Sequence, residues 1–291
     1  MKTWNAEDKA LLMVSHKTRL NYSEPVVESH SEVRKTPVDT GLQRVVTSSI
    51  KVSPNALVDD YIDYFGSHVH HFNILEPHDF VEILTNSVVE TTNAISCGPD
   101  SEVHAQPWKI LLAEFLPWSP AVPYLAEYKD IPSKVHCGLP GDDFIGSLQE
   151  LGSTFKSMFR YDPRATDVHS SPKVLFEKGG GVCQDLAHAM LGVLRLASIP
   201  CRYVSGYVYD AQNQDEGHQI QGAAASHAWV QVWHTDLGWV GIDPTNDKLV
   251  DWQYIRVAVG RDYTDVQPLR GIFVGAPDQS IQVKVEVTRI G

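Results

Sequence analysis

Three consecutive glycines at residues 179–181 come just before a cysteine, Cys183, and an apolar segment with helical spacing. The apolar residues that recur every three or four positions in this segment are Leu186, Ala187, Met190, Leu191, Val193 and Leu194. Glycine allows a sharp backbone turn, and this spacing places apolar side chains along one stripe of a helix. The segment therefore predicts a buried helix from about residue 182 to 197, with its first turn facing a cleft.

A thiol in the first turn of a helix is a candidate nucleophile. The positive end of the helix dipole and the unpaired backbone N–H groups favour the thiolate, which is the reactive form. The same N–H groups can bind the oxyanion that forms when a carbonyl is attacked. The alternative is that Cys183 is a small buried residue, which is the common fate of a free cysteine.

Two short segments after residue 225 predict a β-hairpin. Residues 227–233 read His-Ala-Trp-Val-Gln-Val-Trp, and residues 239–242 read Trp-Val-Gly-Ile. The five residues 234–238 between them are expected to form the loop. The tryptophans of both strands are expected to be core residues, and the alternative for the whole hairpin is a purely structural role.

The register of this hairpin decides whether it can carry a catalytic pair. With a five-residue loop, the two tryptophans that border the loop face each other, and Asp243 lies opposite Trp229. His227 precedes Trp229 by two residues, so His227 and Asp243 share one face of the hairpin. A loop of even length would put them on opposite faces. We therefore predict that Asp243 orients His227, and that His227 is the base for Cys183.

The N-terminal third of the chain predicts an all-β domain. From about residue 14 to 92, short segments rich in Val, Ile, Thr and Tyr are separated by turn signals such as Ser53-Pro54-Asn55. One segment contains His68, His70 and His71, and a His-x-His pair can hold a metal on one strand face. No cysteine or paired carboxylate stands at a compelling ligand spacing nearby, so we predict no metal site.

Prolines and apolar spacing divide the rest of the chain. Seven prolines between residues 93 and 140 make long helices unfavourable there, and Phe115 to Pro120 is expected to pack across a domain boundary, with substrate contact as the alternative. Residues 143–160 have apolar positions at helical spacing and predict a core helix. We predict a β-rich domain at 1–105, a proline-rich linker with short helices at 106–140, and a catalytic core with C-terminal strands at 141–291.

Composition and charge indicate which binding partners and which cellular compartment to expect. The formal net charge is −12 without a cluster of Lys and Arg, which argues against nucleic acid as a partner. The N-terminus lacks a leader pattern and no run is long enough to cross a bilayer, so we expect no membrane partner and a cytoplasmic protein. Four cysteines are too few for a disulfide scaffold. Cys97 and Cys137 are expected in loops, and Cys201 is expected to be buried.

Four motifs resemble those of the bacterial transglutaminase-like family. They are Gly-Val-Cys-Gln-Asp-Leu-Ala-His at 181–188, Ile-Pro-Cys-Arg-Tyr-Val-Ser-Gly-Tyr at 199–207, Ser-His-Ala-Trp-Val at 226–230 and Asp-Pro-Thr-Asn at 243–246. The N-terminal region, with Asp-Tyr-Phe-Gly at 63–66, is similar to the domain usually fused to that family, and residues 260–266 look like a motif near its end. The resemblance implies an α+β, papain-like core in which the nucleophile helix packs on an antiparallel sheet, after an all-β domain. It also implies a triad of Cys183, His227 and Asp243 that requires no cofactor.

The expected chemistry is acyl transfer from an amide of a peptide or protein substrate to water or to a primary amine. The resemblance favours hydrolysis, as in a peptidase or amidase, over protein crosslinking. The rival hypothesis from another functional class is a non-catalytic binding module on the same fold.

Asp185 and His188 lie near the cysteine but are interpreted as structural, and residues 261–265 are left out of the site. Residues 211–225 are polar and then alanine-rich, and are expected to form a loop over the cleft that influences substrate choice. The sequence does not predict the oligomeric state.

Overall fold

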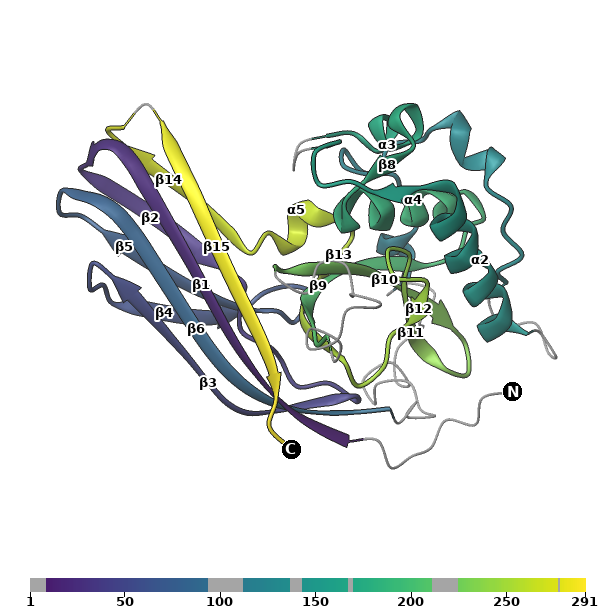
Figure 1. Cartoon of the computed structure of the whole chain (residues 1–291), viewed down its shortest axis with the longest axis horizontal. Helices are drawn as coiled ribbons and strands as arrows, with labels where there is room; N and C mark the ends of the chain where they lie inside the picture. Colours follow the sequence, from purple (N-terminus) through teal and green to yellow (C-terminus); the bar gives the residue numbers. More distant parts are fainter. Residues whose placement is uncertain (1–8, 94–111, 137–142, 167–169, 211–224, 277) are drawn as a thin grey trace.

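The computed structural model describes residues 9–93, 112–136, 143–166, 170–210, 225–276 and 278–291. Within these residues, a sandwich of two four-stranded sheets stands beside a core in which helices cover a five-stranded antiparallel sheet (Figure 1). The predicted α+β class is therefore confirmed, with an all-β N-terminal region before a core whose nucleophile helix packs on an antiparallel sheet.

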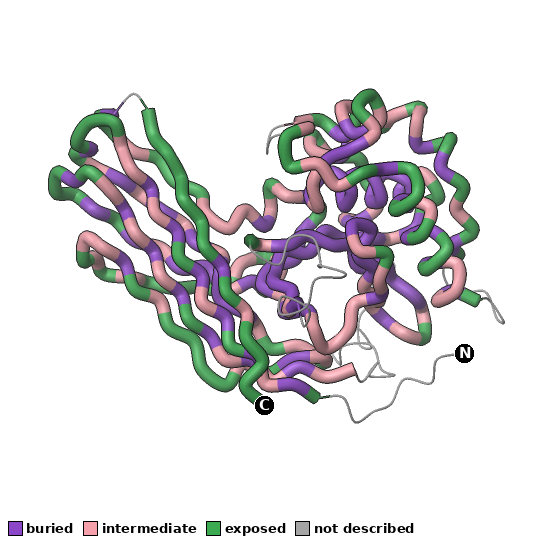
Figure 2. Tube along the Cα trace, viewed as in Figure 1, coloured by how far each residue is buried: buried purple, intermediate pink, exposed green. Residues whose placement is uncertain are grey.

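The sandwich consists of one sheet in the order β15-β1-β6-β3 and another in the order β14-β2-β5-β4. The long strands β1 (Lys9–Val26) and β6 (His78–Thr92) bury alternate residues along most of their length, as expected for strands with one face in a core. The buried and exposed segments are shown in Figure 2. The other N-terminal strands are β2 (Glu28–Val33), β3 (Gln43–Ser53), β4 (Val58–Ile62) and β5 (His68–Ile74).

The last two strands of the chain belong to the sandwich, which corrects the predicted assignment of all of residues 141–291 to the core. Strand β14 (Leu269–Val274) pairs with β2, and β15 (Gln279–Arg289) pairs with β1. In Figure 1 the N-terminal and C-terminal strands lie side by side. Without these partners β1 and β2 would be edge strands with unpaired backbone groups. A pairing between the two ends of the chain leaves no local signal in the sequence.

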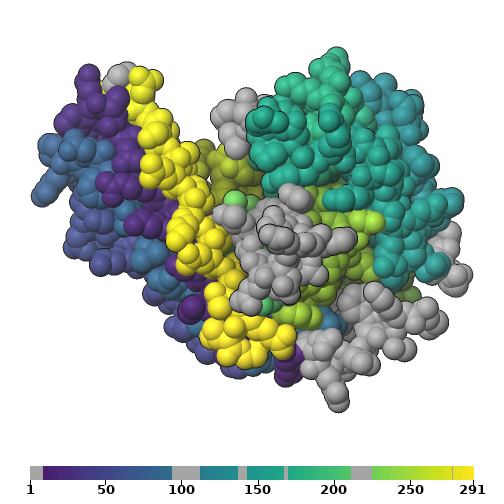
Figure 3. Space-filling model, in the orientation of Figure 1, coloured from purple at the N-terminus to yellow at the C-terminus, as the bar shows by residue number. Residues whose placement is uncertain are grey.

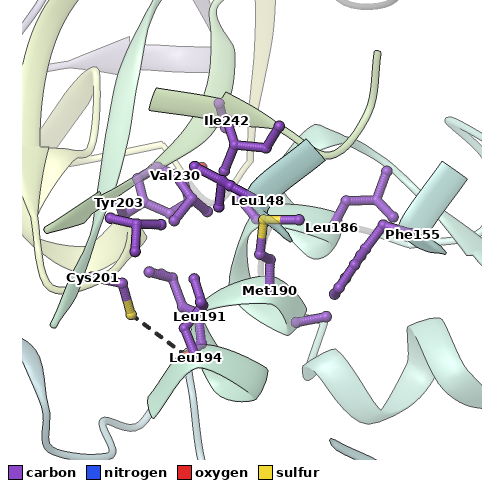
Figure 4. Close-up of a cluster of buried hydrophobic side chains, with 14 of the residues drawn as sticks. Leu148, Phe155, Leu186, Met190, Leu191, Leu194, Cys201, Tyr203, Val230 and Ile242 are labelled. Carbon is purple, nitrogen blue, oxygen red and sulfur yellow. Dashed lines mark hydrogen bonds between the residues drawn. The ribbon is translucent and has the colours of Figure 1, made fainter. Parts of the chain in front are cut away.

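The core sheet has the strand order β12-β11-β10-β9-β13. Its strands are β9 (Cys201–Val208), β10 (His227–His234), β11 (Gly238–Asp243), β12 (Lys248–Leu249) and β13 (Tyr254–Gly260). Helix α4 (Cys183–Leu196) packs on β9 and β10, and Met190 and Leu194 belong to the same apolar cluster as Tyr203 and Val230 (Figure 4). Cys201 is fully buried in this cluster, as predicted.

The two predicted helices begin and end within two residues of their expected positions. Helix α2 (Phe144–Met158) starts where the Asp143 side chain accepts a hydrogen bond from the Gly146 N–H, which is a normal N-cap interaction. It buries Phe144, Leu148, Leu151 and Phe155, which are four members of the predicted apolar stripe. The remaining elements of the core are β7 (Arg160–Tyr161), α3 (Pro172–Lys178), β8 (Gly180–Gly181) and α5 (Tyr263–Val266).

The described part of the linker, residues 112–136, contains the short helices η2 (Ala113–Phe115) and η3 (Ala126–Asp130). The ring of Phe115 lies 6.1 Å from Phe65 of the sandwich region and 5.2 Å from Trp239 of the core, between ring centroids. Phe115 therefore packs where the two regions meet, as expected for its segment. The ring of Trp118 in the same segment lies instead against Tyr124 and Tyr128 of the linker.

Apolar contacts also join the sandwich to the core. Leu12 and Val14 of β1 and Val89 of β6 belong to the same buried cluster as Val230 of the core sheet. Figure 3 shows a hollow between the upper end of the sandwich and the core helices on this face of the molecule. The two regions are therefore in contact over part of their facing surfaces and separated over another part.

A buried polar network crosses the same boundary at Tyr207 of β9. The Tyr207 hydroxyl donates its proton to the Lys35 carbonyl oxygen (2.9 Å). Because a hydroxyl has only one proton, the Tyr207 oxygen must accept the hydrogen bond from His16 Nδ1 (2.8 Å). His16 Nε2 then accepts from the Thr18 hydroxyl (3.1 Å), and the Thr18 oxygen accepts from Lys35 Nζ (2.5 Å). Burial and then the charge of Lys35 lower the pKa of His16 to about 3, and burial lowers the pKa of Lys35 to about 7.

Candidate active site

The predicted nucleophile is the first residue of helix α4. Helix α3 ends at Gly179, whose φ of 63° is in the left-handed region that favours glycine, and two further glycines lead into the new helix. Cys183 is a free thiol and is partly exposed, in contrast to the fully buried Cys201. The structure thus places the sulfur at a helix start with access to solvent, which is the position predicted from the glycine-cysteine segment.

The backbone before Cys183 is held by Asp185. One Asp185 carboxylate oxygen accepts from the Val182 N–H (2.8 Å) and from the Thr166 hydroxyl (2.5 Å). A Cβ on Gly181 would lie 2.6 Å from the same oxygen, so only glycine leaves room for this contact. Asp185 therefore shapes the turn that presents the thiol, in agreement with its interpretation as a structural residue.

The hairpin has the predicted register with a shorter loop. Trp233 pairs with Trp239, as expected, but each strand extends one residue further toward the turn, so that His234 also pairs with Gly238. The parity of the register is unchanged, so His227 and Asp243 share a face as predicted. His227 Nε2 and Asp243 Oδ2 lie 2.7 Å apart, and both side chains are fully buried.

Asp243 is surrounded by hydrogen-bond donors. Its Oδ2 also accepts from the Tyr254 hydroxyl (2.8 Å) and from Asn246 Nδ2 (2.7 Å), while Oδ1 accepts from the Thr245 N–H (2.9 Å). Burial alone would raise the pKa of this carboxyl, but His227 and the other donors outweigh burial and lower it. The group is thus held as a carboxylate whose acceptor sites are occupied.

The environment of His227 favours its protonated form. Burial lowers the pKa of the imidazole, but the charge and hydrogen bond of Asp243, followed by the Cys183 thiol, raise it to about 10. With Nε2 used by Asp243, Nδ1 is the nitrogen left for the thiol. Nδ1 is buried and makes no hydrogen bond of normal geometry among the described residues, so the sulfur is near but not tightly bonded. Such looser contacts are common before substrate binds.

Two residues that support Asp243 were not assigned a role from the sequence. Asn246 stands in the Asp-Pro-Thr-Asn motif, where its closeness to Asp243 in sequence was an available signal. Tyr254 lies on β13, which is separated from Asp243 in the sheet by β10 and β9. Nothing in the sequence around Tyr254 indicates that contact.

The other residues near the cysteine in sequence connect helix α4 to the C-terminal motif. His188 is buried, and its Nε2 accepts from the Tyr263 N–H (3.1 Å). Burial lowers the pKa of His188 to about 4, which suits a neutral acceptor. Asp262 caps α5 through the Thr264 N–H, and Arg261 forms an ion pair with Asp265 (2.9 Å). These contacts agree with the structural interpretation of His188, and they link residues 261–265, which were left out of the predicted site, to helix α4.

No group of three or more His, Cys, Asp or Glu suited to a metal ion occurs in the part of the chain that the structure describes. Of the histidines considered for a metal, His68 instead contacts Asp60 at 2.8 Å, and its ring lies 4.4 Å from that of His70. None of the described helices is long and apolar enough to span a bilayer. The expected loop at 211–225 lies outside the described residues except for its last residue, and Cys97 and Cys137 also lie outside them.

Comparison with known families identifies both regions of the chain. A family model described as "Transglutaminase-like superfamily" matches residues 141–244, which contain all three predicted site residues. A second, described as "Bacterial transglutaminase-like N-terminal region", matches residues 12–90 of the sandwich.

Comparison with individual proteins agrees with the family matches. An uncharacterized protein of Mycobacterium leprae is 34% identical over 96% of this chain and 99% of its own length. A "Protein-glutamine gamma-glutamyltransferase" of Pseudomonas aeruginosa is 37% identical over 28% of this chain and 12% of its own length. The crystal structure of "a Putative Cysteine Protease from Cytophaga hutchinsonii" has a TM-score of 0.73 at 16% identity, and covers 98% of this chain and 92% of that chain. That likeness shows that the fold is shared over nearly the whole molecule.

Proposed function

The chain belongs to the transglutaminase-like superfamily, and from this premise we propose that it is a cysteine enzyme in which Cys183 attacks an amide carbonyl of a peptide or protein. The observation that carries the proposal is the buried His227–Asp243 pair at 2.7 Å, beside a partly exposed cysteine at a helix start. In this proposal Cys183 is the nucleophile, His227 the general acid and base, and Asp243 the group that orients the imidazole.

The raised pKa of His227 supports an imidazolium in the starting state. In the proposed reaction this positive charge and the start of helix α4 stabilise the Cys183 thiolate, which is the attacking form. The thiolate forms a bond to the amide carbon, and backbone N–H groups at the start of α4 stabilise the oxyanion. The C–N bond then breaks, the amine leaves with the proton from His227, and a thioester remains on Cys183. Next, His227 takes a proton from the attacking water or amine, and the new acyl product leaves as the thiolate is restored.

Hydrolysis is the first candidate for the second half of this reaction. It is supported by the fold shared with the cysteine protease structure, which extends over both the sandwich and the core. Transfer to a primary amine is the second candidate, favoured by the local similarity to a glutamine γ-glutamyltransferase. Both use the same thioester, so they differ only in the group that attacks it.

Incubation with a glutamine-containing peptide and a fluorescent primary amine, followed by mass spectrometry, tests both candidates. Free acid indicates hydrolysis and labelled peptide indicates transfer. Cys183→Ala should give neither product, while Cys201→Ala, the matched change at a fully buried cysteine, should keep the activity. The proposal is wrong if Cys183→Ala retains activity. Absence of both products for a broad peptide library would favour a binding module instead.

A further inference from the structure

A cavity of about 110 Å³ lies mainly on the face of the core sheet opposite helix α4, next to the turn at residues 40–43 of the sandwich, and is also lined by Ile145 and Val240 from the cluster that contains α4. Val230 and Val232 of β10 belong to the cluster with α4, so the alternate residues Trp229 and Trp233 point to the other face. Neither Cys183 nor His227 is among the residues that line the cavity. The cavity is therefore separate from the proposed active site, and it lies where two regions of the chain meet, a common place for ligand sites.

Aromatic side chains form much of the cavity wall. Trp229, Trp233, Trp239 and Tyr254 all line it, which gathers three of the seven tryptophans of the chain around one space. The Trp233 and Trp239 rings meet edge to face at 5.4 Å. An apolar cavity of about 150 Å³ is known to hold benzene. At about 110 Å³ the cavity is smaller than that example, so its volume limits a ligand to one ring and excludes a peptide chain, while its aromatic lining favours a ring.

The polar groups of the wall indicate what such a ring should carry. The Nε1–H of Trp229 is buried and has no hydrogen-bond partner among the described residues. A buried donor without an acceptor is unfavourable, so an acceptor on a ligand would relieve a cost already present in the protein.

The charges of the wall favour an anion. Its charged residues are Arg202, Arg256 and Asp251, and the Asp251 carboxylate is already paired with Lys248 at 2.7 Å. Arg202 is fixed by a hydrogen bond to Gln231 (2.9 Å) and by its guanidinium 4.1 Å from the centre of the Trp239 ring. Guanidinium groups pair well with carboxylates.

We propose that this cavity is a binding site for a small single-ring carboxylate, with the ring among the indole side chains and the carboxylate toward Trp229 Nε1 and the arginines. This site goes beyond the proposed acyl transfer, and its test does not depend on enzymatic activity. A ligand there would also contact Tyr254, whose hydroxyl supports Asp243. The site therefore adjoins the catalytic pair from the side opposite the nucleophile helix.

Titration of the full chain with benzoate, followed by calorimetry, tests the site, with benzyl alcohol as the uncharged ring of similar size. We expect one saturable site for benzoate with a Kd of about 1 mM or below, and weaker binding of the alcohol. Binding should persist after Cys183 has been blocked with iodoacetamide, because the cavity does not include the active site. No saturable binding of benzoate would overturn the proposal, and so would loss of binding on blocking Cys183.

Two variants locate the ligand. Arg256→Gln should weaken benzoate binding about tenfold, as expected for a lost charge-assisted contact, and the backbone of residue 256, not its side chain, makes the bonds to Gln43. Arg44→Gln removes an exposed guanidinium outside the cavity and should leave the Kd unchanged. Leu42→Trp, at a partly buried turn residue that lines the cavity, should fill the space and abolish binding. Equal weakening by Arg256→Gln and Arg44→Gln, or full binding in folded Leu42→Trp, would overturn the assignment.

Discussion

Two fully buried histidines in this molecule have opposite protonation behaviour. His227 of the core and His16 of the sandwich are 1% and 2% exposed, and burial lowers the pKa of both. Asp243 beside His227 more than reverses the effect, whereas Lys35 near His16 reinforces it, so the pKa is raised to about 10 at one site and lowered to about 3 at the other. The Asp243 carboxylate outweighs burial at His227 and makes it a candidate acid and base, whereas at His16 burial, reinforced by Lys35, leaves a neutral structural link.

The same contrast fixes how each histidine contributes to stability as pH changes. The raised pKa of His227 adds stability that is fully present below pH 6.5 and is lost as pH rises through about 10. For His16 the unfolded chain binds more protons between about pH 3 and 6.5, so its contribution makes the fold more stable as pH rises through that window. One site therefore favours the folded state when protonated, and the other when neutral.

The strongest test of the contrast is the same substitution at both positions. We expect His227→Gln to reduce kcat/KM at least about 10⁴-fold, because catalytic residues of such a triad act as a unit. It should also lower stability, because the fully buried Asp243 carboxylate loses its partner. His16→Gln should leave kcat/KM nearly unchanged and lower the melting temperature, because it disturbs the network of Thr18 and Tyr207. Steady-state kinetics and thermal unfolding of both variants check this. Similar activity losses in the two would mean that the roles assigned here are wrong.

Removal of the Asp243 charge, which gives His227 a different pKa from His16, should have the next largest effect. Asp243→Asn keeps the size of the side chain but takes the carboxylate from His227. We expect the pKa of His227 to fall. We also expect kcat/KM to decrease, but by a factor about 10² smaller than the decrease in His227→Gln. NMR titration of the His227 ring measures the pKa directly. An unchanged titration would show that Asp243 does not control the protonation of His227.

At the sandwich, the charge of Lys35 can be removed instead. Lys35 has a lowered pKa, so between about pH 7 and 10.5 the unfolded chain binds more protons and the wild-type protein gains stability as pH rises. Lys35→Met should therefore be more stable than wild type near pH 6. Above pH 7 the difference in free energy of unfolding between the variant and the wild type should shrink by up to about 1.4 kcal/mol per pH unit. Denaturant unfolding across this range checks the slope. A difference independent of pH would contradict the lowered pKa.

The smallest expected effects come from two tyrosines, one at each site. Tyr254→Phe removes a hydrogen bond to the Asp243 carboxylate and should lower kcat/KM about tenfold. Tyr207→Phe removes the hydroxyl that links His16 to the Lys35 carbonyl, and should lower stability while kcat/KM stays near the wild-type value. Kinetics with pH profiles for both variants distinguish the roles. Loss of activity in Tyr207→Phe alone would indicate that the sandwich controls the active site.

The parts of the molecule that follow from local sequence were predicted correctly. Apolar spacing located α2 and α4, and the parity of the hairpin placed His227 and Asp243 on one face even though the loop is shorter than expected. Such features depend on periods of two or three to four residues within one segment.

Features that depend on distant partners were missed. The C-terminal strand β15 pairs with β1, and the contact of Tyr254 with Asp243 requires β13 to pair with β9. The buried Lys35 network likewise requires Tyr207, which lies 172 positions later in the chain. Local patterns show that a strand or a core residue exists, but not which distant segment it meets.

The rate of alkylation of Cys183 by iodoacetamide as a function of pH, read by mass spectrometry, tests the proposed nucleophile most directly. A free thiol ionises near pH 8.5, so its rate falls about tenfold for each pH unit below that value. We predict that Cys183 in the wild-type protein keeps most of its reactivity down to pH 6, and that His227→Gln removes this reactivity. A wild-type profile that follows the free thiol, or one that His227→Gln leaves unchanged, would contradict the account.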